Sequence, residues 1–465
     1  MRTRKPPLSN DDWLTEELQN ALRNGSRISE WYNVFGLSHN PFSEKLSPKG
    51  RDCWLERKDV VLKIIRQVGA SKRRVAIRPT MGGGSPHLLV VGPRYVGRTA
   101  LSQWLAHELN KRHLPDLSIT VRAFSFNWTQ DFKNGSQSGD AAANLVEDQR
   151  RWVQWLADLE RIIQEESISS KSLVLFFLDD ILTFFRGRTP NFAELAEEVT
   201  NLHPIFIGFL SWGEYQYALD KNSQPMFQEF FRQFRNNTVF IPPFQQKEIY
   251  SLLEQRILAI GSRLEPFQKS ALKRICWYSM GLPGLALDLG TQVLMAAAER
   301  NLDKITRADI DVVAGKLGYQ VARERLDDGT KTLQGRVSRG PFLVGRRREV
   351  LLEFLYKLAI PKYQQKEGFG LTAKKLRERL DISFSTVSYH LSQLQKASAN
   401  PFGVLDAYQH PEDGRSTIFY LEKPMVSAVE LLLGSQKLLG IEKRREFIAD
   451  PQIDSPNTFS KVKNQ

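Results

Sequence analysis

Val91-Gly92-Pro93-Arg94-Tyr95-Val96-Gly97-Arg98-Thr99 is the stretch of sequence that decides the fold. It follows an apolar run at 88–91 and precedes a helical pattern that starts at Ala100. The spacing matches the phosphate-binding template G-x-x-x-x-G-K-[ST] at every fixed position except one, because Arg98 replaces the lysine. In such a loop, backbone N–H groups and a helix N-terminus face the phosphates, and the hydroxyl of Thr99 becomes a Mg²⁺ ligand. The stretch therefore predicts a nucleotide site with ATP and Mg²⁺ as cofactors, built from Gly92, Pro93, Val96, Gly97, Arg98, Thr99 and Ala100.

Arg98 also limits this prediction. A guanidinium keeps the positive charge of lysine, but it lacks the compact ammonium that reaches between the β- and γ-phosphates. The loop thus predicts nucleotide binding and leaves open whether the protein is an active ATPase.

The composition narrows the class of partner and the compartment. The chain has 65 Lys and Arg against 52 Asp and Glu, a formal net charge of +13, which favours a polyanionic partner such as nucleic acid. Cys53 and Cys276 lie far apart and lack metal-ligand spacing, as is typical of a reducing compartment. The strongest apolar run, 173–178, is far shorter than the ~20 residues of a membrane helix. We therefore expect a soluble cytoplasmic protein that does not bind membranes.

Apolar runs and helical patterns alternate after the first fifty residues. Strands are expected at 88–91, 117–126, 173–178, 205–210 and 239–241, with helices between them, which predicts an α/β fold with a parallel sheet covered on both faces. After Pro242 and Pro243 the pattern becomes purely helical. The predicted order is an N-terminal extension (1–50), a nucleotide-binding core (51–244), a helical lid (245–320), a linker (321–340), a winged-helix domain (341–425), and a C-terminal helix with a disordered tail (426–465).

A second motif follows the apolar run 173–178. Asp179 and Asp180 stand where a buried strand would deliver an acidic pair at its C-terminal end. Asp179 would hold a Mg²⁺-bound water, and Asp180 would polarise the attacking water. The alternative is a strand that ends in an ordinary Asp-rich turn, although the upstream loop favours the functional interpretation.

These motifs resemble the AAA+ class, in particular the origin-recognition and cell-division-cycle initiator ATPases and the neighbouring signal-transduction (STAND) ATPases. The resemblance covers roughly residues 36–425, and the order of its elements is more specific than any one motif. It includes Asn40-Pro41-Phe42, the two nucleotide motifs, and the segments 205–210, 234–244, 281–289 and 305–310. It implies a P-loop parallel sheet with a helical lid, followed by a winged helix-turn-helix.

The resemblance also implies roles for residues outside the two motifs. Ser211 matches the polar sensor of the γ-phosphate, and its alternative is a plain strand-end serine. Arg235, preferred over Arg232, matches the arginine finger supplied to a neighbouring subunit, which implies a homo-oligomer; the alternative is a solvated basic helix end. Gly284 stands where the lid usually has an Arg, so the second sensor is expected to be lost. With Arg98 and Asp180, three positions that support turnover are altered.

The C-terminal region predicts a helix-turn-helix with a wing. Thr372 and Ser383 are expected to cap two helices, and the wing is expected around 410–415. The second helix could enter the major groove of double-stranded DNA, although its outward face is polar rather than basic. Basic residues around it suit phosphate contacts that position the domain without specifying sequence. The predicted DNA-contacting residues are Lys374, Ser385, Thr386, Ser388, Tyr389, Gln393 and Arg415.

Together these features predict an ATP-binding AAA+ protein that acts as a nucleotide-controlled DNA-binding switch, similar to an initiator, with weak or no hydrolysis. One alternative is a non-hydrolysing STAND-like regulatory scaffold of a mobile-element or defence system, in which the winged helix contacts a protein. Another is a transposition-regulator ATPase, which Asn40-Pro41-Phe42 mildly supports.

Overall fold

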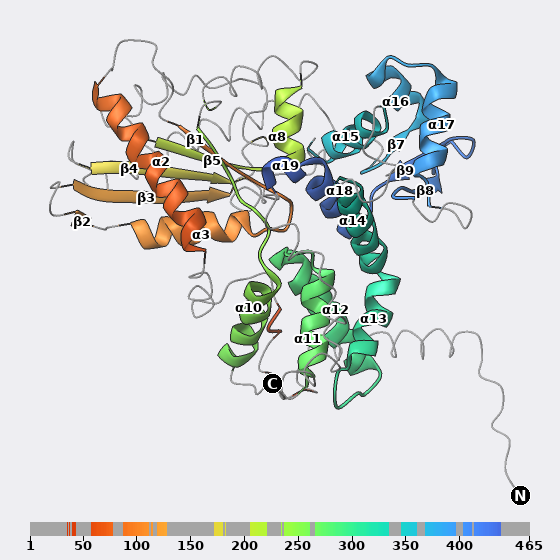
Figure 1. Cartoon of the computed structure of the whole chain (residues 1–465), viewed down its shortest axis with the longest axis horizontal. Coiled ribbons are helices and arrows are strands. Elements are labelled where there is room, and N and C mark those ends of the chain that lie inside the picture. Colours follow the sequence, from red (N-terminus) through yellow and green to blue (C-terminus); the bar gives the residue numbers. More distant parts are fainter. Residues whose placement is uncertain are drawn as a thin grey trace, which may run out of the picture.

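The computed structural model is shown in Figure 1. Among the residues that the structure describes, no helix has the length and apolar character of a membrane span. The described residues are 35, 37, 40–42, 57–77, 87–110, 113–114, 119–127, 172–179, 182, 205–220, 234, 237–260, 266–333, 346–359, 368–396, 403–411 and 413–438.

A six-stranded sheet forms the centre of the core. Its order is β2-β3-β4-β5-β1-β6, and all neighbours are parallel except the short β2, which pairs antiparallel with β3. Strands β1 and β5 are buried along their whole length, as predicted for a sheet covered on both faces. The strands are β1 (Leu88–Gly92), β2 (His113–Leu114), β3 (Ile119–Asn127), β4 (Ser172–Asp179), β5 (Ile205–Ser211) and β6 (Thr238–Phe240).

The strand order determines where the motifs meet. β1 lies between β5 and β6, and β4 lies on the other side of β5. The C-terminal ends of β1, β4 and β5 therefore lie side by side, and ligands bind at this edge in open α/β sheets. Helix α3 (Arg98–Leu109) starts there and packs against β3, β4 and β5, while α2 (Lys58–Ile77) and α8 (Trp212–Leu219) both contact β1.

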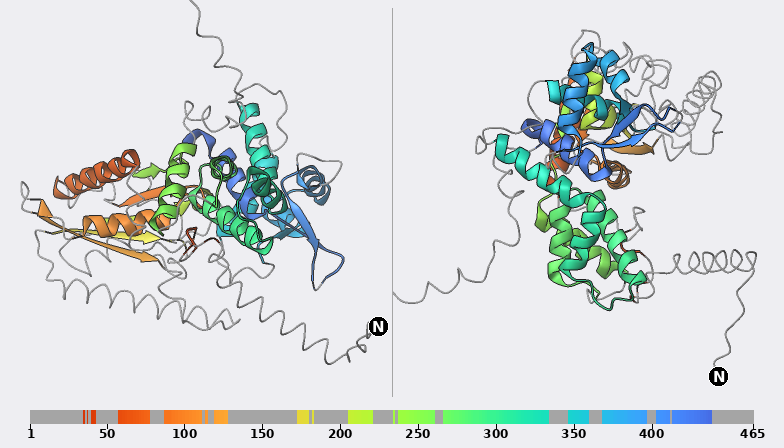
Figure 2. Two further views of the ribbon diagram at one scale, coloured as in Figure 1. Left: turned by 90° about the horizontal axis from the view of Figure 1, so that it is seen from below. Right: turned by 90° about the vertical axis from the view of Figure 1, so that its right-hand side faces the viewer.

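The lid is a helical bundle that Figure 2 (right) shows in green, apart from the sheet. A capping box of Thr306 and Asp309 starts its fourth helix. Phe42 packs edge-on against Phe267, with ring centroids 5.6 Å apart, so the Asn-Pro-Phe segment is part of the lid. The lid helices are α10 (Gln246–Ala259), α11 (Lys269–Tyr278), α12 (Pro283–Glu299), α13 (Arg307–Lys316) and α14 (Tyr319–Leu333).

Helix α14 occupies much of the segment predicted as a linker at 321–340. The segment is polar in sequence, but its charges are paired along the helix. Arg323, only 1% exposed, bonds Asp327 at 3.0 Å, and Arg325 bonds Asp328 at 3.5 Å. The linker prediction was wrong up to Leu333, because i,i+3 and i,i+4 ion pairs let a charged sequence form a packed helix.

The C-terminal region forms a winged helix and then returns to the core. Its three-stranded sheet has the order β7-β9-β8. Figure 1 shows α18 between the winged helix and the core, where it packs against α14. The elements are α15 (Arg346–Ala359), β7 (Leu371–Thr372), α16 (Ala373–Leu380), α17 (Phe384–Leu394), β8 (Asp406–Gln409), β9 (Thr417–Tyr420), α18 (Lys423–Leu433) and α19 (Ser435–Leu438).

Candidate nucleotide site and winged-helix surface

The loop between β1 and α3 is tightly curled. Tyr95 and Gly97 have positive φ values of 65° and 88°, and a left-handed residue such as the second is normally glycine. A side chain at Gly92 would place its Cβ 2.9 Å from Val96 Cγ1, so this position also requires glycine. The two fixed glycines of the motif thus serve the turn and the close approach of the loop to its own strand.

Thr99 and Asp179 meet at the sheet edge. The Thr99 hydroxyl, in the first turn of α3, donates a hydrogen bond to Asp179 Oδ2 at the end of β4. Asp179 is only 4% exposed. A hydroxyl oxygen beside a carboxylate is a donor pair of the kind that Mg²⁺ prefers, so these residues fit the predicted metal.

The side chain of Arg98 is held by an acidic residue that was not predicted. Arg98 Nη1 lies 3.1 Å from Glu214 Oε2, and both side chains are largely buried. Glu214 also lies 3.7 Å from a guanidinium nitrogen of Arg94, so two loop arginines converge on one carboxylate. The positive charge of Arg98 is therefore already partly neutralised at the place where phosphate would bind.

Ser211 is the last residue of β5, and it caps the next helix. Its hydroxyl accepts a hydrogen bond from the Glu214 N–H at 3.1 Å, and the Glu214 carboxylate accepts from the Ser211 N–H at 2.5 Å. This reciprocal pair is a capping box at the start of α8. Ser211 is fully buried and lies one strand away from the loop, so it is placed near the candidate site without a demonstrated sensor role.

The predicted Asp180 and Arg235, together with Arg232, lie outside the described residues. Their catalytic and arginine-finger roles stay predictions.

Gly284 brings the lid directly onto the phosphate loop. The Gly284 N–H donates to the Tyr95 carbonyl at 2.9 Å. A Cβ at Gly284 would lie 2.9 Å from Tyr95 Cβ and 3.1 Å from the Tyr95 carbonyl oxygen. The absence of an arginine here thus has a structural reason, because no side chain fits between the lid helix and the loop.

Helix α18 contacts the loop through a buried carboxylate. Glu430 has 0% exposure, and its Oε2 accepts the Arg94 N–H at 2.6 Å while its Oε1 accepts the Gly213 N–H at 3.0 Å. The guanidinium of Arg94 lies 3.7 Å from the same carboxylate and donates to the Leu358 carbonyl of α15 at 3.1 Å. Burial raises the pKa of Glu430, whereas the charge of Arg94 and the two backbone donors lower it. Glu430 therefore joins the loop, the start of α8 and the C-terminal region.

A second contact links α18 to the lid. Lys423 Nζ lies 2.9 Å from Asp288 of α12 and 5.1 Å from the centre of the Tyr95 ring. Asp288 also accepts a hydrogen bond from the Tyr319 hydroxyl of α14 at 2.5 Å. One helix thus contacts the phosphate loop and the lid at once.

Glu214 and Glu430 were missed in the sequence, although each left a signal. Glu214 has capping-box spacing from Ser211 at the end of an apolar strand. Glu430 is a lone acid within the apolar stretch 424–433, and a buried charge needs partners. Neither signal identifies the arginine that each acid meets, because Arg98 and Arg94 lie in a distant segment of the chain.

The winged helix exposes some of the side chains predicted to contact DNA. α17 buries Val387, Leu391 and Leu394, as its spacing predicts, and Ser383 and Thr372 cap their helices. Exposed residues are Lys374, Ser385, Tyr389, Gln393 and Arg415, whereas Thr386 and Ser388 are half-buried.

Two other residues of this surface refine the prediction. Arg379 is a basic residue of α16, and it bonds Glu353 at 2.9 Å, so its charge is already paired. His390 is half-buried, which suits a supporting residue rather than one that contacts bases.

The arrangement of the core identifies the fold. Numbered along the chain, the five parallel strands have the spatial order 2-3-4-1-5. The loop comes after the first strand, Asp179 ends the third and Ser211 ends the fourth. A helical lid rests on the loop and a winged helix follows. The fold is that of the AAA+ ATPases.

Comparisons with known proteins give matches among solved structures, at low identity. No family model and no curated protein matches the sequence. Among solved structures, the Holliday junction branch migration motor RuvB of Thermotoga maritima is 15% identical, with 81% of this chain and 96% of that chain covered and a TM-score of 0.37. ORC2 of Aeropyrum pernix, in ADPNP–ADP complexes, is 13% identical (86% and 98% covered, TM-score 0.38). ORC1 of the same organism, in complex with DNA, is 16% identical (80% and 92% covered, TM-score 0.34).

Proposed function

We propose that this protein binds ATP with Mg²⁺ and uses the nucleotide to control binding of its winged helix to double-stranded DNA, as an initiator-like switch with weak or no hydrolysis. The observation that carries the proposal is the contact of Glu430 with the Arg94 N–H. The phosphate loop cannot change shape at Arg94 without moving or releasing α18, the helix that follows the winged helix. A ligand that changes the loop therefore has a direct route to the DNA-binding domain.

The Thr99 and Asp179 pair supports the metal in this proposal. When bound, Mg²⁺ would neutralise charge on the β- and γ-phosphates. Thr99 would orient one ligand position from the first turn of α3, and Asp179 would hold the other from the buried end of β4. The N–H groups at the start of α3 would bind phosphate through the positive end of that helix.

Weak turnover is supported by the surroundings of Arg98. Its guanidinium shares Glu214 with Arg94, so phosphate would compete with a carboxylate for the same donors. Efficient transfer needs positive charge that is arranged in advance around the γ-phosphate. The close approach at Gly284 leaves no room for the lid arginine of the second sensor, which also supports weak turnover. The site thus suits binding better than catalysis.

DNA binding is supported by the exposed cations of the winged helix. Lys374 and Arg377 are exposed on α16, and Arg415 is exposed in the wing. These side chains would contact phosphates, while Ser385, Tyr389 and Gln393 would approach the groove. The proposal includes a homo-oligomer, in which Arg235 would serve as the arginine finger for a neighbouring subunit. It also includes a cytoplasmic location, in keeping with the buried free thiol of Cys276.

A non-hydrolysing scaffold is the second candidate, and one observation favours it. The outward face of α17 has no charged residue, and it exposes Phe384 to 55% and Tyr389 to 56%. Exposed aromatic side chains are enriched at protein interfaces. In this version nucleotide is a structural ligand and the winged helix recruits a protein.

Fluorescence anisotropy with a labelled duplex separates the two candidates. The switch predicts duplex binding that weakens steeply with salt and changes when Mg-ATP is added. Thermal unfolding with Mg-ATP provides the parallel measurement of nucleotide binding. If the protein binds ATP but no duplex at low salt, the scaffold is the correct account; if Mg-ATP neither binds nor stabilises the fold, both are wrong.

A further inference from the structure

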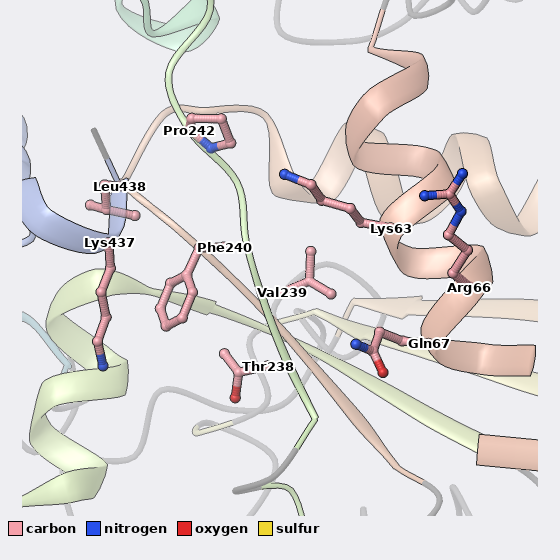
Figure 3. Close-up of a pocket in the computed structure, with 9 residues that line it drawn as sticks. All are labelled: Lys63, Arg66, Gln67, Thr238, Val239, Phe240, Pro242, Lys437 and Leu438. Carbon is pink, nitrogen blue, oxygen red and sulfur yellow. The ribbon is translucent and has the colours of Figure 1, made fainter. Parts of the chain in front are cut away.

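A groove follows the edge of the core sheet at β6 (Figure 3). Its volume is ≈ 480 Å³. Helix α2 forms one wall and α19 forms the other, with the strand between them. The lining residues are Lys63, Arg66, Gln67, Thr238, Val239, Phe240, Pro242, Lys437 and Leu438.

Strand β6 lies at one edge of the core sheet. It ends the strand order, and within the described part of the chain no strand pairs with its outer side. Toward β1, the Asn237 carbonyl accepts from the Leu89 N–H and the Ile241 N–H donates to the Val91 carbonyl, each at 2.8 Å. Because peptide groups alternate along a strand, the N–H and C=O groups of Thr238 and Phe240 point outward into the groove.

The charge of the groove has a single sign. Lys63 and Arg66 are exposed and lie three residues apart on α2, so they project from the same side of the helix. Lys437 projects from α19, with Nζ 5.3 Å from the centre of the Phe240 ring. None of the nine lining residues is acidic. A ligand with carboxylates is therefore favoured over a neutral or basic one.

The backbone edge distinguishes a peptide from nucleic acid. Thr238 and Phe240 each offer one donor and one acceptor, in the alternation that another strand complements. A phosphate chain has acceptors only and would leave the two carbonyls unmatched. Val239 and Phe240 add apolar surface at the centre, where side chains of an added strand would pack.

We propose that an extended acidic segment of a partner protein docks in this groove by adding a strand to the outer edge of β6. The segment would place carboxylates at alternate positions, toward Lys63 and Arg66 on one side or Lys437 on the other. Pro242 has no N–H, so pairing stops before it and only a short segment is held. This surface does not depend on nucleotide or DNA binding.

Selection of random peptides displayed on phage tests the proposal on the full-length protein. Enriched sequences should carry acidic residues at alternate positions and no proline at their centre. The charge-reversed variant K63E/R66E/K437E should bind a selected peptide at least about tenfold more weakly. The matched control K269E/K273E changes two exposed lysines of the lid and should leave the affinity unchanged.

A second variant tests the backbone pairing itself. Thr238→Pro removes an outward N–H while the pairing toward β1 is kept. The loss of one hydrogen bond should weaken binding of the peptide about fivefold. Thr238→Val keeps the N–H and should bind as the wild type does. Circular dichroism and ATP binding verify that the variants are folded.

Four outcomes would overturn the proposal. One is that selection enriches no acidic peptide. The second is equal binding by the charge-reversed variant, and the third is equal binding by Thr238→Pro and Thr238→Val. The fourth is a single-stranded oligonucleotide that displaces the peptide and loses affinity in the charge-reversed variant, which would identify a nucleic-acid surface.

Discussion

Replacing Glu430 with glutamine should disconnect the nucleotide site from the winged helix. In the wild type one carboxylate oxygen accepts the Arg94 N–H at 2.6 Å and the other accepts the Gly213 N–H at 3.0 Å. The glutamine side chain has the same size but only one acceptor oxygen, so one backbone donor loses its partner. An unpaired buried donor costs about 1–3 kcal/mol. Glu430→Ala would leave both backbone donors without a partner, at about 2–6 kcal/mol. It would also remove one of the partners of the half-buried Arg94 guanidinium.

The assay is a set of four dissociation constants, for DNA with and without Mg-ATP and for Mg-ATP with and without DNA. Coupling between two sites is usually ~1–3 kcal/mol. In the wild type each ligand should therefore change the dissociation constant of the other by about 5–150-fold, and by the same factor in both directions. In E430Q each ligand should still bind, and this factor should fall to about twofold or less.

The matched control is Glu353→Gln. Glu353 is a buried carboxylate of the same C-terminal region, bonded to Arg379 rather than to the loop. E353Q should keep the full coupling. If E430Q also keeps it, or if E353Q loses as much, Glu430 is not the link and the reasoning is refuted.

Three further changes test the site and the core. Thr99→Val removes the hydroxyl beside Asp179, and it should weaken Mg²⁺-dependent ATP binding by at least about tenfold, or ~1.4 kcal/mol, in calorimetry; unchanged affinity would contradict the metal assignment. Gly284→Ala puts a Cβ 2.9 Å from Tyr95, so urea unfolding should show a loss of ~1–3 kcal/mol, and no loss would mean that the lid does not rest on the loop. Burial lowers the pKa of His87 to about 3, so the unfolded chain takes up a proton below its ordinary pKa of about 6.5 while the folded chain does not. Stability should therefore fall by ~2 kcal/mol between pH 6.5 and pH 5, and by much less in His87→Gln; equal pH dependence in the two proteins would exclude His87 as the cause.

The sheet and the winged helix were predictable because their signals are local. The apolar runs 88–91 and 173–178 are short, buried strands, and each is followed by residues whose type is restricted by the turn or by the proposed metal. The capped helices at Thr372 and Ser383 are equally local, since a cap and the helix it stabilises lie within four residues. Helix α14 was missed although its i,i+3 and i,i+4 ion pairs are equally local, because its polar composition is also typical of a linker.

The side-chain contacts that hold the site together were not predictable from local patterns. Arg98 suggested weak turnover by its chemistry alone, but its partner Glu214 is 116 residues away. Glu430 is 336 residues from Arg94, and nothing in the sequence near either residue specifies the pair. Gly284 was interpreted as a lost sensor, and only the contact with Tyr95 supplies the steric reason for glycine.

The central claim is that the loop binds Mg-ATP and turns it over slowly. The most direct measurement is ATP binding and single-turnover hydrolysis by the wild type and Arg98→Lys, each with and without duplex DNA. We predict that the wild type binds Mg-ATP, that its turnover stays well below ~1 s⁻¹, the lower end of typical enzymes, and that Arg98→Lys is at least as fast. Failure to bind Mg-ATP, or wild-type turnover within the typical range, would contradict the account.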